Sequence, residues 1–125
     1  MIIGIGLDEI DVARMEKELR ENTGLKETLF TPAEIAYCES KRYSAQNYAA
    51  RFAAKEAFLK ALGTGRQTGQ TFGEIEIVHD KLGKPACVLH GKAREAAEER
   101  GINTIHVSLT HLKDIAAAVV VLEKR

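Results

Sequence analysis

The sequence predicts a small α+β domain with a buried central helix and antiparallel strands. A strand-like segment and several helical segments come first, and two strand pairs with a helix between them follow, unlike the regular alternation of a parallel sheet. Apolar residues surround almost the whole circumference of segment 44–62, which is typical of a helix inside a domain. A length of 125 residues fits one domain, 1–125.

The opening segment, residues 2–7, is rich in β-branched residues and is predicted to form a buried strand. Its alternation places Ile3, Ile5 and Leu7 on one face and Gly4, Gly6 and Asp8 on the other. Because glycine has no side chain, a helix or a ligand could approach the backbone closely beside Asp8.

Helical signals follow the first strand. Apolar residues recur at helical spacing over residues 11–21, which predicts an amphipathic surface helix. Residues 31–34 form a capping box that begins a short helix running to about residue 39. The buried helix covers 44–62 and ends at Gly63, and a flexible glycine-containing segment is expected over 63–66.

The second half of the chain predicts two hairpins. Residues 74–78 and 86–89 flank a turn at 80–85, and residues 105–110 and 115–122 flank a turn at 113–114. Between the hairpins, residues 92–100 predict a helix closed by Gly101.

Composition excludes several classes of protein. Lys plus Arg equals Asp plus Glu at 18 each, so no overall positive charge favours nucleic acid. The two cysteines, Cys38 and Cys87, form neither a CxxC pair nor a cluster with zinc spacing, so we expect free thiols. The apolar run at 2–7 is too short for a signal peptide or a membrane span, which predicts a cytoplasmic protein that does not enter a membrane.

Three charged residues are candidates for chemistry. Glu56 and Lys60 are one helical turn apart on the buried helix, so a charged pair there would be partly desolvated. Spacing alone favours a structural salt bridge. If the first strand meets this helix, however, Asp8 and Glu56 would suit Mg²⁺, which takes few carboxylates and prefers a phosphate ligand, and Lys60 would supply a charge for that phosphate.

Two weaker signals lie near the ends of predicted elements. The segment Gly63–Gly65 could turn backbone N–H groups toward phosphate, although it lacks the ending of a Walker loop and suits a flexible helix exit equally well. His111 at a strand end could hydrogen-bond a ligand, or it could be a solvated surface residue.

Taken together, several motifs resemble the holo-[acyl-carrier-protein] synthase family of 4′-phosphopantetheinyl transferases in order and spacing. They are GIGLD at 4–8, Arg14, RFAAKEA at 51–57, KALGTG at 60–65, GKP at 83–85 and VSLTH at 107–111. The resemblance covers essentially the whole chain and implies a 4′-phosphopantetheinyl transferase-like fold. It implies transfer of phosphopantetheine from coenzyme A to a serine of apo acyl carrier protein, in support of fatty acid biosynthesis.

The resemblance also implies roles for individual residues. Asp8 and Glu56 would bind Mg²⁺, Lys60 would contact phosphate, and the coenzyme A cleft would be lined by Arg51, Gly63, Pro85 and His111. Arg14 would dock the acidic recognition helix of the carrier protein, with Phe52 nearby. Family members are homotrimers whose coenzyme A sites lie between neighbouring subunits. Either Glu56 itself or a metal-bound water would accept the serine proton.

Two other functions compete with this interpretation. The same carboxylates would also suit a metal-dependent phosphatase or pyrophosphatase. Alternatively, the chain is a non-catalytic module that binds an acidic partner through its first helix, with Glu56 and Lys60 as a buried salt bridge.

Overall fold

The computed structural model describes residues 1–63 and 72–125, so Thr64, Gly65 and Arg66 of the predicted flexible segment lie outside the described residues. The elements are β1 (Ile2–Asp11), α1 (Val12–Glu21), α2 (Leu25–Leu29), α3 (Pro32–Glu39), α4 (Ser44–Leu62), a 3₁₀ turn (Phe72–Glu74), β2 (Ile75–His79), β3 (Pro85–Leu89), α5 (Gly91–Glu99), β4 (Thr104–His111) and β5 (Ile115–Glu123). In these two ranges no helix is long and apolar enough to span a bilayer. The cytoplasmic location stays a prediction.

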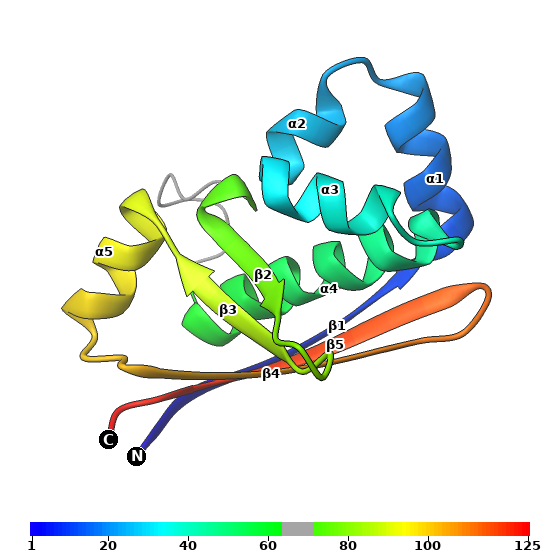
Figure 1. Ribbon diagram of the computed structural model, residues 1–125. Coiled ribbons are helices and arrows are strands. Elements are labelled where there is room, and N and C mark those ends of the chain that lie inside the picture. The colour runs from blue at the N-terminus through cyan, green and yellow to red at the C-terminus, as the bar shows by residue number, and fades with distance from the viewer. Residues whose placement is uncertain (64–71) are drawn as a thin grey trace.

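The strands form two antiparallel sheets, which confirms the α+β class. β5 lies between β1 and β4 in the three-stranded sheet, and β2 pairs with β3 in the other. Helix α4 crosses one face of the larger sheet, while α1, α2 and α3 gather at one end of the molecule and α5 lies at the other (Figure 1). Both predicted hairpins are present, and the pairing of β1 with β5 joins the two ends of the chain.

The glycines of β1 allow α4 to lie directly on the strand, as the sequence predicts. A Cβ added at Gly4 would overlap the carbonyl oxygen of Ala61, and one added at Gly6 would overlap that of Ala57. Both contacts are with helix backbone, which cannot move aside as a flexible side chain can. The absence of side chains at these two positions therefore brings β1 and the middle of α4 into contact.

Two expectations about β1 were wrong. The strand extends to Asp11, so Asp8 lies inside it opposite Ala118. Asp11 caps α1 by accepting a hydrogen bond from the Arg14 backbone N–H at 3.1 Å. Nor is the strand buried on both faces. Ile3, Ile5 and Leu7 are 37%, 61% and 67% exposed, because α4 covers only the opposite face of the sheet.

Two clusters of buried side chains make the core, and α4 contributes to both. One lies between the C-terminal half of α4, β5 and β2, and the other lies between the start of α4 and α1 to α3. The expectation of a buried α4 is confirmed, since twelve of its residues are buried. Helix α2 was not predicted, because five residues are too few to show helical periodicity.

Candidate active site

Strand β1 and helix α4 bring Asp8 and Lys60 into contact. The Lys60 ammonium donates to Asp8 Oδ1 at 2.6 Å and to the Leu7 carbonyl at 3.2 Å. This hydrogen bond, followed by the negative charges of Asp8 and Glu56, raises the pKa of Lys60. The sequence predicted a partly desolvated Glu56–Lys60 pair, but the side chain of Lys60 is 55% exposed and its hydrogen bond is to Asp8.

Asp8 and Glu56 line one cavity of about 510 Å³. Arg14 and Phe52, the two residues predicted to dock a carrier protein, line the same cavity. Its remaining lining residues are Glu9, Ile10, Asp11, Met15, Glu18, Leu25, Leu29 and Phe72. The rings of Phe52 and Phe72 lie with their centroids 5.1 Å apart, so the cavity combines carboxylates with an apolar wall.

The donor set of this cavity suits a hard cation only in part. Within residues 1–63 and 72–125, no group of three or more His, Cys, Asp or Glu side chains could hold a metal ion. Two carboxylates from different elements nevertheless match Mg²⁺, which keeps several waters and commonly binds one or two carboxylates together with substrate phosphates. Asp8 and Glu56 therefore fit this ion when a phosphate group is also present.

Both arginines of α1 are paired with glutamates of the same helix. Arg14 Nε lies 3.3 Å from Glu18 Oε1, and Arg20 lies 3.7 Å from Glu16. The side chains of Arg14 and Glu18 are 79% and 48% exposed, so water screens their attraction. Arg14 can therefore exchange Glu18 for another carboxylate at little cost in free energy.

A second cavity, of about 200 Å³, collects three residues predicted to line the coenzyme A cleft. Arg51, Pro85 and His111 line it together with Tyr37, Asn47, Ala50, His79, Gly83 and Leu109. None of these residues lines the first cavity. Arg51 and Glu56 are five positions apart on α4, which separates their directions by about 140°. A short stretch of α4 therefore contributes to the two cavities from different sides of the helix.

Gly63 is the remaining residue predicted to line the coenzyme A cleft. It ends α4 in a left-handed conformation with φ of 81°, as predicted for a helix terminator, and it lines neither cavity as the described residues form them. Its neighbours Thr64 and Gly65, which the sequence analysis considered for phosphate binding, lie outside the described residues.

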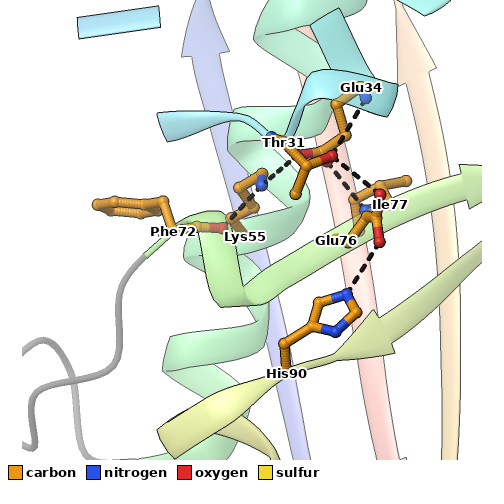
Figure 2. A network of polar contacts seen from close by, with 7 residues as sticks. All are labelled: Thr31, Glu34, Lys55, Phe72, Glu76, Ile77 and His90. Carbon is orange, nitrogen blue, oxygen red and sulfur yellow. Dashed lines mark hydrogen bonds and ion pairs between the residues drawn. The ribbon is translucent and has the colours of Figure 1, made fainter. Parts of the chain in front are cut away.

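A buried polar network that the sequence analysis missed supports the wall of the first cavity. Figure 2 shows Lys55 between Glu34 and Phe72. Its ammonium donates to Glu34 Oε1 and to the Phe72 carbonyl, each at 2.7 Å, and the side chains of Lys55 and Glu34 are fully buried. Burial lowers the pKa of Lys55 despite the opposing charge of Glu34. A lysine on the apolar circumference of α4 was the signal that such a partner exists.

Glu34 has two roles in this network. It closes the predicted capping box, because Oε1 accepts from the Thr31 backbone N–H at 2.9 Å. Its other oxygen, Oε2, accepts from the backbone N–H of Ile77 on β2 at 2.9 Å (Figure 2). One carboxylate therefore connects α3, α4 and β2, and through Lys55 it holds Phe72 in the cavity wall.

Comparison with known proteins gives concordant results. Residues 4–120 match the model of the 4′-phosphopantetheinyl transferase superfamily. The holo-[acyl-carrier-protein] synthase of Geotalea daltonii is 50% identical over 99% of this chain and 100% of its own. That of Neisseria meningitidis is structurally similar, with a TM-score of 0.88, 36% identity and coverage of 99% and 100% of the two chains. The Helicobacter pylori enzyme in complex with coenzyme A has a TM-score of 0.82, 32% identity and coverage of 95% and 99%.

Proposed function

Because this chain belongs to the 4′-phosphopantetheinyl transferase superfamily, we propose that it is a holo-[acyl-carrier-protein] synthase. It transfers phosphopantetheine from coenzyme A to a serine of apo acyl carrier protein and so supports fatty acid biosynthesis. The observation that carries the proposal is the first cavity. There Asp8 and Glu56 lie beside Arg14 and Phe52, in a chain that matches holo-[acyl-carrier-protein] synthases along its whole length.

The proposed cofactor is Mg²⁺, with Asp8 and Glu56 as its ligands. When bound, the ion would neutralise negative charge on the diphosphate of coenzyme A. Lys60, which is exposed and hydrogen-bonded to Asp8, would contact a phosphate oxygen with its flexible positive charge. The two carboxylates and one ammonium therefore form a charged cluster suited to a diphosphate.

The reaction forms one bond to phosphorus and breaks another. The carrier serine oxygen attacks the β-phosphorus of coenzyme A, and the bond from that phosphorus to the bridging oxygen breaks, releasing adenosine 3′,5′-bisphosphate. The serine proton passes to Glu56 or to water. Positioning and electrostatic stabilisation supply most of the rate acceleration in such phosphoryl transfers. Arg14 and Phe52, which line the same cavity, would position the carrier beside the carboxylates.

We further propose a homotrimer in which each coenzyme A site lies between two subunits. The first and second cavities share no lining residue, and Glu56 and Arg51 project into them from different sides of α4. In a composite site, Asp8, Glu56 and Lys60 of one subunit face Arg51, Pro85 and His111 of the next. The exposed sheet face with Ile3, Ile5 and Leu7 supports self-association, since apolar patches of this kind mark interaction surfaces.

Mixed oligomers test this composite site. Arg51→Ala and Glu56→Gln each inactivate a homogeneous oligomer, but co-expression of the two variants restores activity. In a random equal mixture, about one quarter of the sites combine two intact halves. The specific transfer rate of the purified mixture is the measurement. Asp8→Ala mixed with Glu56→Gln is the matched control and restores nothing, because both changes lie in one half. A mixture as inactive as its parents would place the whole site in one subunit.

Breaking the Arg14–Glu18 ion pair is expected to increase the affinity for the carrier protein. Glu18→Gln releases Arg14 for the acidic carrier helix and lowers the KM for carrier protein by about two- to fourfold at low salt. The gain shrinks as salt is added, since added ions screen exposed charges. Steady-state transfer rates at two salt concentrations measure it. Glu16→Gln, which does not line the first cavity, is the control. An unchanged KM would show that Arg14 does not dock the carrier.

The mass of an apo carrier protein tests the proposed function. Incubation with the enzyme, coenzyme A and Mg²⁺ adds the mass of one phosphopantetheine group, and chelation of the metal abolishes the increase. No mass change, with hydrolysis of coenzyme A when no carrier is present, would instead indicate a phosphatase or pyrophosphatase. If neither the modified carrier nor hydrolysed coenzyme A were formed, the non-catalytic binding module would be favoured.

A further inference from the structure

Arg51 is held by two aromatic side chains at the wall of the second cavity. Arg51 Nη2 lies 2.9 Å from His79 Nδ1, and its guanidinium carbon lies 4.0 Å from the centre of the Tyr37 ring. The Tyr37 and His79 rings are stacked, with centroids 4.6 Å apart and planes 5° apart. These three side chains, from α4, β2 and α3, all line the second cavity.

The direction of the Arg51–His79 hydrogen bond fixes the state of the imidazole. A guanidinium has only donors, so Nδ1 of His79 accepts, and the neutral ring carries its proton on Nε2. If His79 were protonated, its Nδ1–H would face an N–H of Arg51, and neither group could accept a hydrogen bond. A second positive charge would also lie beside Arg51. The observed arrangement therefore requires neutral His79.

Arg51 retains donors for a ligand. Arg51 is 1% exposed, and its Nε has no hydrogen-bond partner among the residues that the structure describes. A buried N–H without a partner costs free energy, and an anion in the adjoining cavity would remove that cost. The guanidinium thus contacts His79 through Nη2 and Tyr37 through one face, and its Nε–H is left without a partner among the described residues.

We propose that His79, through its neutral imidazole, is a positioning residue that orients Arg51 to receive a phosphate group of coenzyme A in the second cavity. This rests on the proposed function. His79 lies outside every motif of the family resemblance. The proposal assigns the effect of His79 to coenzyme A binding and not to the chemical step.

The charges around His79 predict how this binding depends on pH. Arg51 on α4 and Lys41 after α3 are positive, Asp80 in the β2–β3 turn is negative, and Tyr37 and His111 line the same cavity. Burial, then Arg51 and Lys41, lower the pKa of His79, and Asp80 opposes them. The neutral form therefore prevails above this lowered pKa. Binding weakens as pH falls through it, since protonation releases Arg51.

Two variants of the full-length chain separate the hydrogen bond from the ring stacking. His79→Phe keeps a ring on Tyr37 but removes the acceptor, and we expect a rise of about tenfold in the Kd for adenosine 3′,5′-bisphosphate and in the KM for coenzyme A, with kcat unchanged. His79→Gln keeps an acceptor that does not titrate, so binding stays close to that of the unmodified chain. Calorimetric titrations between about pH 4.5 and pH 8 report the Kd. This range extends about two units below the pKa of an ordinary histidine, because the pKa of His79 is lowered.

The Kd values of the two variants and of the unmodified chain together support or overturn the positioning role of His79. The proposal is supported if His79→Phe alone binds more weakly and if His79→Gln loses less affinity at acid pH than the unmodified chain does. Unchanged affinity in His79→Phe overturns it, and so does equal weakening in both variants with an unaltered pH profile. If the unmodified chain binds neither coenzyme A nor adenosine 3′,5′-bisphosphate, the proposed function fails as well, which distinguishes that failure from a failure of the positioning role alone.

Discussion

Glu56→Gln lowers the rate of phosphopantetheine transfer by about 10²- to 10³-fold and leaves the fold intact. Glutamine preserves the size of the side chain but removes the negative charge that a cation or the serine proton requires. Asp8→Ala has a comparable effect, because it removes the other proposed metal ligand, which lines the same cavity. Initial rates at saturating coenzyme A and Mg²⁺ measure the loss.

Glu9→Gln is the matched control for these two variants. Glu9 lines the same cavity, but alternation along β1 directs it to the opposite face of the sheet from Asp8. Its replacement changes the rate by no more than about threefold, in keeping with a solvated charge. Thermal unfolding of all three variants shows whether the fold is retained. Full activity in both Asp8→Ala and Glu56→Gln would mean that the proposed metal site is wrong.

The largest effect on stability is expected at the buried ion pair. Lys55→Met lowers the free energy of unfolding by about 3–5 kcal/mol, because it leaves the Glu34 carboxylate buried without its ammonium partner. Lys55 and Glu34 lie 2.7 Å apart and their side chains have no exposed area. The same change removes the donor to the Phe72 carbonyl, so the wall of the first cavity loses its support. Urea denaturation measures the difference.

Two further variants identify the cause of this loss. The double change Glu34→Gln with Lys55→Met costs less than Lys55→Met alone, because no charge is then left buried without a partner. Lys60→Met replaces an exposed lysine on the same helix and shifts the free energy of unfolding by no more than about 1 kcal/mol. If Lys55→Met were as mild as Lys60→Met, the buried pair would not stabilise the fold.

Local signals in the sequence predict much of this fold. The capping box at Thr31 begins α3, Gly63 ends α4, and the two hairpins follow from alternation and turn residues. The alternation of glycine with isoleucine in β1 even predicts which face a helix approaches. Each of these features depends on residues close together in the chain, which is why periodicity and capping rules find them.

Features set by distant pairing were not predictable in this way. β1 pairs with β5 from the far end of the chain, and this pairing keeps the strand extended to Asp11. The partner of Lys60 is Asp8, 52 positions away, and that of Lys55 is Glu34, 21 positions away. Helical spacing suggests only neighbours one turn apart, so it pointed to Glu56 for Lys60. His79 carries no local signal, because its contacts with Arg51 and Tyr37 arise from packing.

Calorimetric titration of coenzyme A with and without Mg²⁺ tests most directly whether Asp8 and Glu56 hold a divalent ion together with the substrate diphosphate. We expect Mg²⁺ to tighten binding by tenfold or more in the unmodified chain, on the order of 1.4 kcal/mol, and to have no effect in Asp8→Ala or Glu56→Gln. Equal tightening by Mg²⁺ in all three proteins would contradict the account.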